Sequence, residues 1–255
     1  MNHLKFLVTG TGRCGTVFMA KLLTSLGINC GHESVFTYEN EKAIIEKLVT
    51  PKLRTISNCS TINLLEDESL RTPKNWIDPQ KTIAESSYLA VPHLFHPHVA
   101  NIPIIHVVRN PLDVISSYTM DFQYFNDKVP NKENPYNELG WENKIYDFCP
   151  ELSHINNVFE RACWFYVKWT DEIEKACLTR SHLFLNLERL DYEKLFTFLD
   201  IKNKPKEIFS DKTANSNKKR QTNIELTTIP NGLIKKLFSN KMIKYGYLPP
   251  SVKIL

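Results

Sequence analysis

A glycine-rich stretch near the N-terminus, GTGRCG at residues 10–15, has the residue types that bind an anion. It matches G-x-G-x-x-G, the pattern of dinucleotide-binding loops, and also G-x-x-x-x-G, the frame of phosphate-binding P-loops. Residues 5–8 before it form a short apolar run, and apolar residues recur at helical spacing from 16 to 26. This order of strand, glycine loop and helix predicts an anion site built from backbone N–H groups at a helix N-terminus.

The residues around this loop favour some anions over others. A dinucleotide site needs an acidic residue about twenty positions further on, and Glu33 lies in roughly that place. Chemistry on a nucleoside triphosphate with Mg²⁺ needs Gly-Lys-Ser/Thr at the end of the loop, whereas Gly15 is followed here by Thr16 and Val17. What remains is an anion-binding loop that carries its own cation, Arg13.

A second candidate phosphate site lies about ninety residues downstream, in VVRNPLDVISSY at residues 107–118. Arg109 follows a β-branched apolar run, and Ser117 lies eight positions later on the helix expected after the proline turn. A guanidinium offers a charged fork to a phosphate, and a hydroxyl adds a short hydrogen bond. Because open α/β sheets bind ligands at one edge, two such sites predict a ligand with two separated anionic groups.

The pattern of strands and helices predicts an α/β fold. The strands expected after the first one lie at residues 81–86, 102–110 and 182–190. A long helix is expected at 158–178, and this alternation favours a central parallel β-sheet flanked by helices on both faces. Without an internal repeat or a linker, residues 1–255 are expected to form one domain. Residues 37–80 and 121–156 do not follow this alternation of strands and helices. Long segments of this kind are typical of lids and binding loops.

Four segments together resemble the sulfotransferases that use 3′-phosphoadenosine 5′-phosphosulfate (PAPS). TGTGRCGTVF is similar to the loop that binds the 5′-phosphosulfate, and RNPLDVISSY is similar to the 3′-phosphate motif. AESSYL and the ending KYGYLPP are similar to further family segments, in the same order along most of the chain. The resemblance implies a P-loop-containing nucleotide-hydrolase-like sulfotransferase fold, closest to bacterial and carbohydrate-type members. It also implies in-line transfer of a sulfuryl group from PAPS to an acceptor hydroxyl, with adenosine 3′,5′-bisphosphate (PAP) as the product.

The resemblance further implies which residues hold the donor. The 5′-phosphosulfate would be bound by a set of loop residues: Gly12, Arg13, Cys14, Gly15, Thr16 and Val17. Arg109 and Ser117 would bind the 3′-phosphate. Lys219 and Arg220 would close over the same phosphate, although a basic cluster of this kind is more often a solvated charge run.

The proton of the acceptor needs a general base. By the same resemblance Glu85, at the end of the strand expected at 81–86, is this base, and Arg13 is the second catalytic residue, at the departing oxygen. The alternative for Glu85 is a structural role in a helix cap or a salt bridge. His32 or His93 would then be the next candidate for the base.

The H-x-x-H-x-H run of His93, His96 and His98 is the best candidate for a metal site. Pro97 breaks any helix that would align the first pair, and the run contains no carboxylate or cysteine. We therefore expect no metal cofactor.

Charge and composition restrict the partners and the compartment. The net charge of +4 is too mild for a protein that coats nucleic acid, but it suits a small polyanionic ligand. The first residues do not resemble a signal peptide, and no apolar run approaches the length of a membrane helix. We expect a cytoplasmic protein with a small-molecule or carbohydrate acceptor and without nucleic-acid or membrane partners; the sequence does not predict its oligomeric state.

The six cysteines show no C-x-x-C spacing and are expected to be reduced thiols. Cys14 lies near a helix N-terminus, which could make its thiol more acidic, but a small residue that fits a tight turn is the favoured interpretation. Two other functions stay open: a P-loop nucleotide kinase or phosphotransferase, and a non-catalytic nucleotide-binding protein. The missing Gly-Lys-Ser/Thr argues against the first, and a Glu85 side chain pointing away from the loop would favour the second.

Overall fold

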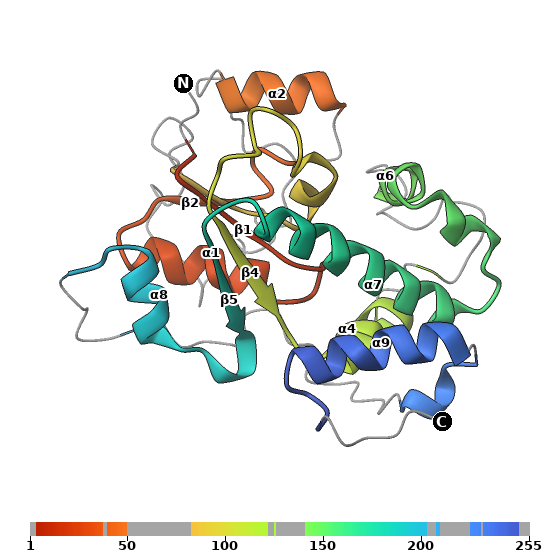
Figure 1. Ribbon diagram of the computed structural model, residues 1–255. Coiled ribbons are helices and arrows are strands. Elements are labelled where there is room, and N and C mark those ends of the chain that lie inside the picture. The colour runs from red at the N-terminus through yellow and green to blue at the C-terminus, as the bar shows by residue number, and fades with distance from the viewer. Residues whose placement is uncertain are drawn as a thin grey trace.

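A five-stranded parallel sheet lies at the centre of the part of the chain that the structure, a computed structural model, describes (Figure 1). The described residues are 4–37, 40–49, 83–121, 125, 141–202, 208–209, 225–230 and 232–249. The strands are β1 (Phe6–Thr9), β2 (Cys30–His32), β3 (Ala84–Ser86), β4 (Ile104–Val108) and β5 (His182–Asn186). Their order is β2-β3-β1-β4-β5, and every neighbouring pair is parallel. This topology confirms the α/β fold class expected from the sequence.

The strands differ from the sequence expectation in one additional strand and in where they begin and end. β3 and β4 are shorter than the segments expected at 81–86 and 102–110. The sequence does not predict β2, because this strand has only three residues with Gly31 at its centre, too few to show a pattern. β5 ends at Asn186, earlier than the apolar run suggests. The side chain of Asn186 accepts hydrogen bonds from the N–H groups of Glu188 (3.1 Å) and Arg189 (3.2 Å), and the chain turns there into a short 3₁₀ helix.

Helices cover both faces of the sheet, as expected. The α-helices are α1 (Thr16–Ser25), α2 (Glu41–Val49), α4 (Pro111–Ser116), α6 (Trp141–Phe148), α7 (Val158–Cys177), α8 (Tyr192–Phe198) and α9 (Gly232–Lys244). Short helices of other kinds are η3 (Tyr88–His93), η4 (Ser117–Asp121), η5 (Pro150–His154), η6 (Leu187–Arg189) and η7 (Leu226–Thr228).

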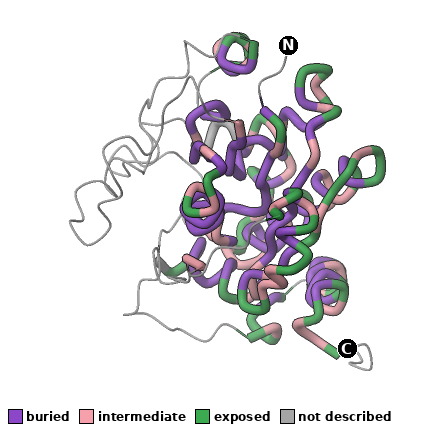
Figure 2. Tube along the Cα trace, turned by 90° about the vertical axis from the view of Figure 1, so that its left-hand side faces the viewer, coloured by how far each residue is buried: buried purple, intermediate pink, exposed green. Residues whose placement is uncertain are grey.

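The two faces of the sheet carry separate hydrophobic clusters. Leu7 of β1 packs with residues of α4, α7 and α9, whereas its neighbour Val8 packs with residues of α1 and α8. This alternation is what a strand covered on both faces requires. The buried residues accordingly run through the middle of the molecule, with exposed ones on the outer turns (Figure 2).

Both predicted phosphate motifs begin at neighbouring strand ends. From β1 the chain continues to β2 on one side of the sheet, whereas from β4 it continues to β5 on the other side. Ligands of open parallel sheets bind at the carboxyl ends of the strands where the order switches in this way. The loop at 10–15 follows β1 and Arg109 follows β4, and the two strands pair in parallel. The fold therefore brings the two motifs to one switch point.

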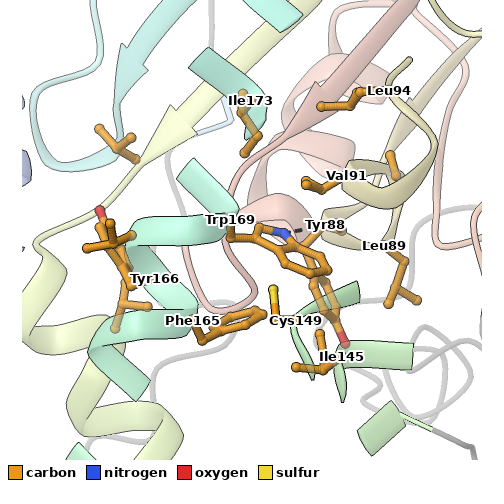
Figure 3. Close-up of a cluster of buried hydrophobic side chains, with 14 of the residues drawn as sticks. Tyr88, Leu89, Val91, Leu94, Ile145, Cys149, Phe165, Tyr166, Trp169 and Ile173 are labelled. Atoms are coloured by element: carbon orange, nitrogen blue, oxygen red, sulfur yellow. Dashed lines mark hydrogen bonds between the residues drawn. The ribbon is translucent and has the colours of Figure 1, made fainter. Parts of the chain in front are cut away.

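Aromatic side chains of α7 form a cluster beside the segment that follows β3, the strand that pairs with β1 (Figure 3). Phe165, Tyr166 and Trp169 are buried, and Trp164, at the same helical spacing, is partly buried. The ring N–H of Trp169 donates a hydrogen bond of 3.2 Å to the carbonyl of Tyr88. Tyr88 begins η3 shortly after β3, so the bond anchors the chain that leaves β3 to the long helix.

Several segments discussed above lie outside the described residues, among them most of 37–80, much of 121–156, and Lys219 and Arg220. Among the helices that are described, none combines the length and the apolar character needed to cross a membrane.

Candidate active site

The loop between β1 and α1 has the backbone geometry of an anion-binding nest. Arg13 and Gly15 have left-handed φ angles of 66° and 102°. Gly15 is the N-cap of α1, and no side chain caps this end of the helix. The first N–H groups of a helix have no partner within it, and here Thr16 and Val17 provide them. The loop can therefore donate backbone hydrogen bonds to a phosphate or sulfate.

Close packing requires glycine at two further loop positions. A Cβ atom at Gly10 would lie 2.2 Å from the carbonyl oxygen of Val107 in β4. A Cβ atom at Gly12 would lie 2.7 Å from the hydroxyl of Tyr118, which donates a hydrogen bond of 2.8 Å to the carbonyl of Gly12 itself. Side chains at either position would push the loop away from its supports.

Arg13 and Ser117 join the two predicted phosphate motifs. Nε of Arg13 donates a hydrogen bond of 3.1 Å to Oγ of Ser117. Ser117 is buried at the end of α4, a helix that begins at Pro111 and is capped by Asn110, whose side chain accepts from the N–H of Leu112. The sequence expects Ser117 beside Arg109; the structure places it against the cation of the first loop.

Arg109 lies at the end of β4 between two carboxylates. Its guanidinium is 3.7 Å from Oδ2 of Asp113 and 3.9 Å from Oε1 of Glu188, and its side chain is 32% exposed. The pKa of Asp113 is raised, chiefly by burial, although the charge of Arg109 lowers it; the charge of Glu188 also raises it. Partly exposed ion pairs of this length are weak. The guanidinium can therefore turn towards an incoming phosphate.

Glu85 is fully buried in β3. Its carboxylate accepts hydrogen bonds from the N–H and the hydroxyl of Ser34, both 2.6 Å, and from the N–H of Val35 at 3.0 Å. A Cβ atom at Gly31 would lie 2.3 Å from Oε2 of Glu85, so glycine in β2 makes the room for this carboxylate. These contacts clamp the turn that follows β2.

Glu33, in that turn, is the functional candidate whose role the sequence does not predict. Its backbone is left-handed, with φ of 51°, and its carboxylate lies 3.8 Å from Nε2 of His32. The same imidazole nitrogen is 3.3 Å from Oγ1 of Thr16 in the loop. Burial and the charge of Glu85 raise the pKa of Glu33 to about 8, although Arg13 lowers it. The sequence suggests Glu33 only as the acidic residue that a dinucleotide site would need, and it does not show that the residue lies close to Glu85 and Arg13.

The histidines lie in different surroundings. Burial lowers the pKa of His32 to about 4, so this imidazole is neutral at pH 7. His93 is buried against the ring of Phe36, whereas His96 and His98 stack on each other at the surface. No cluster of three or more metal-binding side chains occurs among the residues that the structure describes.

Cys14 is buried beneath the loop. Burial raises the pKa of its thiol to about 12, although hydrogen bonds to backbone groups and the charge of Arg109 lower it. Proximity to the helix N-terminus therefore does not make this thiol acidic, and the interpretation as a small residue that fits the turn is favoured.

These features define an α/β protein that carries a glycine loop with Arg13 at the switch point of its parallel sheet, and a second arginine, Arg109, at the end of the neighbouring strand. The family model of the sulfotransferase domain matches residues 4–237, and the chain belongs to this family. Comparison with curated protein sequences gives no match. Membership supports sulfuryl transfer as the chemistry of the site.

Proposed function

We propose that this protein transfers a sulfuryl group from PAPS to a hydroxyl of a small-molecule or carbohydrate acceptor, within a single domain over residues 1–255. The observation that carries the proposal is the hydrogen bond between Arg13 and Ser117. This bond connects the guanidinium of Arg13, in the first candidate phosphate motif, to the hydroxyl of Ser117, in the second. Both motifs follow strand ends at the same edge of the sheet. A ligand with a 5′-phosphosulfate and a 3′-phosphate has the two anionic groups that such a site requires.

The loop residues fit the 5′-phosphosulfate. Left-handed Arg13 and Gly15 form a concave backbone, and the uncapped start of α1 adds N–H donors and the positive end of the helix dipole. Thr16 adds a hydroxyl, and the guanidinium of Arg13 can neutralise the charge that develops on the departing phosphate oxygen. PAPS supplies the activated sulfuryl group, and the chain supplies position and charge.

Arg109 is proposed to bind the 3′-phosphate together with Ser117. Its two ion pairs are long, so exchanging a carboxylate for a doubly charged phosphate is favourable. Lys219 and Arg220 are proposed to lie over the same phosphate. They are outside the described residues, and the proposal for them rests on the sequence resemblance.

Two neighbouring carboxylates are available to take the proton of the acceptor. Glu85 is the base that the resemblance implies, and Glu33 lies within electrostatic range of both Glu85 and Arg13. A carboxylate close to the loop is well suited to this step, because desolvation makes it more basic. The proposed reaction needs one of the two to be ionised when the acceptor is present.

Ligand binding tests this function before the acceptor is known. In calorimetric titration and thermal denaturation, PAP should bind and raise the melting temperature, whereas ATP with Mg²⁺ should do neither. Stabilisation by ATP with Mg²⁺ alone would favour a nucleotide phosphotransferase. Binding of PAP without transfer from radiolabelled PAPS to any of a panel of sugars, phenols and amines would favour a non-catalytic nucleotide-binding protein.

A further inference from the structure

Glu33 and Glu85 lie close enough to interact electrostatically, yet their surroundings differ. Glu85 is fully buried and accepts three hydrogen bonds from Ser34 and Val35. The side chain of Glu33 remains 12% exposed. An acceptor hydroxyl must reach the carboxylate that deprotonates it. Of the two side chains, only that of Glu33 keeps exposed surface.

The hydrogen bonds of Glu85 suit a structural role. Two backbone N–H groups and one hydroxyl donate to its carboxylate and engage both of its oxygens, so these contacts tie the side chain to the turn. The bonds also close the turn directly after Glu33. Since the N–H of Glu33 donates to the carbonyl of Ser86 (3.4 Å), β3 holds this turn on both sides of the Glu33 side chain.

Glu33 itself has the surroundings of a functional group. A left-handed glutamate is strained, and such strain is retained where the neighbouring structure enforces it, commonly at active sites. Its carboxylate contacts His32, whose imidazole reaches the hydroxyl of Thr16 at the start of α1. The side chain is therefore linked to the loop proposed to hold the sulfuryl group.

We infer that Glu33 takes the proton of the acceptor, and that Glu85 is a positioning residue that acts through the turn at Ser34 and Val35. The inference rests on the proposed function. As the O–H bond of the acceptor breaks, its proton passes to the carboxylate of Glu33. The acceptor oxygen forms a bond to sulfur, and the bond between sulfur and the 5′-phosphate oxygen breaks, with its electron pair leaving on PAP. The Glu33 carboxylic acid then returns the proton to water.

Burial and two charged neighbours determine when Glu33 can act as a base. Burial raises the pKa of its carboxyl most, the negative charge of Glu85 on β3 raises it further, and the positive charge of Arg13 in the loop lowers it, which gives a pKa of about 8. His32 on β2 is neutral above about pH 4 and adds no charge. Below pH 8 Glu33 is mostly protonated, so turnover should rise with pH through about 8.

A titration of the ligand-free protein tests this arrangement independently of activity. Carboxyl carbon shifts measured by NMR should show a glutamate that titrates near pH 8 and disappears in Glu33→Gln. In Glu85→Gln the midpoint of Glu33 should move to lower pH, because a negative charge has been removed. The amide of Gln can still accept from both N–H groups and donate to Ser34, so the turn is retained. A Glu33 midpoint that stays unchanged in Glu85→Gln would overturn the coupling between the two carboxylates on which the division of roles rests.

Turnover separates the two carboxylates. With radiolabelled PAPS and the best acceptor of the panel, Glu33→Gln should lower kcat by about 10²–10⁴-fold, with little change in PAP affinity. Glu85→Gln should lose less than about 10-fold, with the rising limb of its pH profile shifted downwards. Glu193→Gln, an exposed carboxylate on α8, is the matched control and should behave like the wild type.

The outcomes of the turnover assay are distinct. A greater loss in Glu85→Gln than in Glu33→Gln, or wild-type turnover in Glu33→Gln, overturns the division of roles but leaves the proposed function intact. A wild-type protein that neither binds PAP nor transfers the label overturns the proposed function and the inference with it.

Discussion

The hydroxyl of Tyr118 donates a hydrogen bond to the carbonyl of Gly12, and these residues are 106 positions apart in the chain. The bond connects η4, the helical turn directly after α4, to the centre of the glycine loop at 10–15. The ring of Tyr118 packs against those of Phe125 and Phe165, at centroid distances of 5.7 and 5.4 Å. The loop conformation therefore depends on aromatic packing distant from it in sequence.

Gly12→Ala should be destabilising, because the new methyl group would lie 2.7 Å from the Tyr118 hydroxyl. Overpacking of this kind costs about 1–3 kcal/mol in the free energy of unfolding. Tyr118→Phe alone should cost about 1 kcal/mol, the value of one hydrogen bond. The double variant should be close to Tyr118→Phe, since the next atoms are 3.5 Å from the methyl group. Urea denaturation of the wild type, the two single variants and the double variant measures these differences in the free energy of unfolding.

Gly10→Ala is the matched control for this cycle. Its methyl group would meet the backbone carbonyl of Val107 at 2.2 Å, which no change at Tyr118 can relieve. If Tyr118→Phe rescued both alanine variants equally, the close contact between Gly12 and Tyr118 would not be the cause of the destabilisation.

Arg109→Ala should weaken PAP binding by roughly 2–4 kcal/mol, because it removes a charged hydrogen-bonding partner of the 3′-phosphate. Ser117→Ala should cost about 1 kcal/mol, as one lost hydrogen bond. Isothermal titration calorimetry measures both. Lys175→Ala, an exposed cation near the end of α7, is the control and should bind PAP like the wild type. Unchanged affinity in Arg109→Ala would exclude this residue from the site.

Arg13→Met should reduce turnover far more than PAP binding, because the proposed role of the guanidinium is to stabilise charge that develops in the transition state. Arg13→Lys should recover part of the turnover, since it restores the charge. Steady-state kinetics with calorimetry separates the two effects. Equal losses in affinity and turnover would instead make Arg13 an anchor for the bound donor.

Glu174 should make the protein sensitive to acid. Burial raises the pKa of this carboxyl, but hydrogen bonds from Lys241, Lys244 and Tyr245 outweigh it and hold the pKa at about 2. Because the folded pKa lies below the unfolded one, the stabilisation is complete above about pH 4.5 and is lost as the pH falls towards 2.

The matching variant is Glu174→Gln. It should lower the free energy of unfolding at pH 7 by about 2 kcal/mol and flatten the loss of stability between pH 4.5 and 2. Chemical denaturation at a series of pH values checks both. An acid limb as steep as that of the wild type would show that the contacts of Glu174 with α9 do not stabilise the fold.

The sequence alone determines the parts of this protein that depend on local pattern. The glycines of the first loop and the buried run before Arg109 predict the strands and the turns that follow them, because backbone geometry and hydrophobic periodicity act over a few residues. The helix at α7 and its buried aromatic residues follow in the same way. These patterns suffice to predict the α/β fold, and they put the two candidate phosphate motifs at strand ends.

Only the tertiary structure decides how those motifs meet and which groups titrate. β2 forms because β3 pairs with it, and three residues carry too little local signal to predict a strand. The hydrogen-bond partners of Glu85 lie about fifty positions away, and the partner of Ser117 lies 104 positions away. Burial and neighbouring charge raise the pKa of Glu33, and burial raises that of Cys14. Desolvation and charge interactions depend on distances in space, which a linear pattern does not contain.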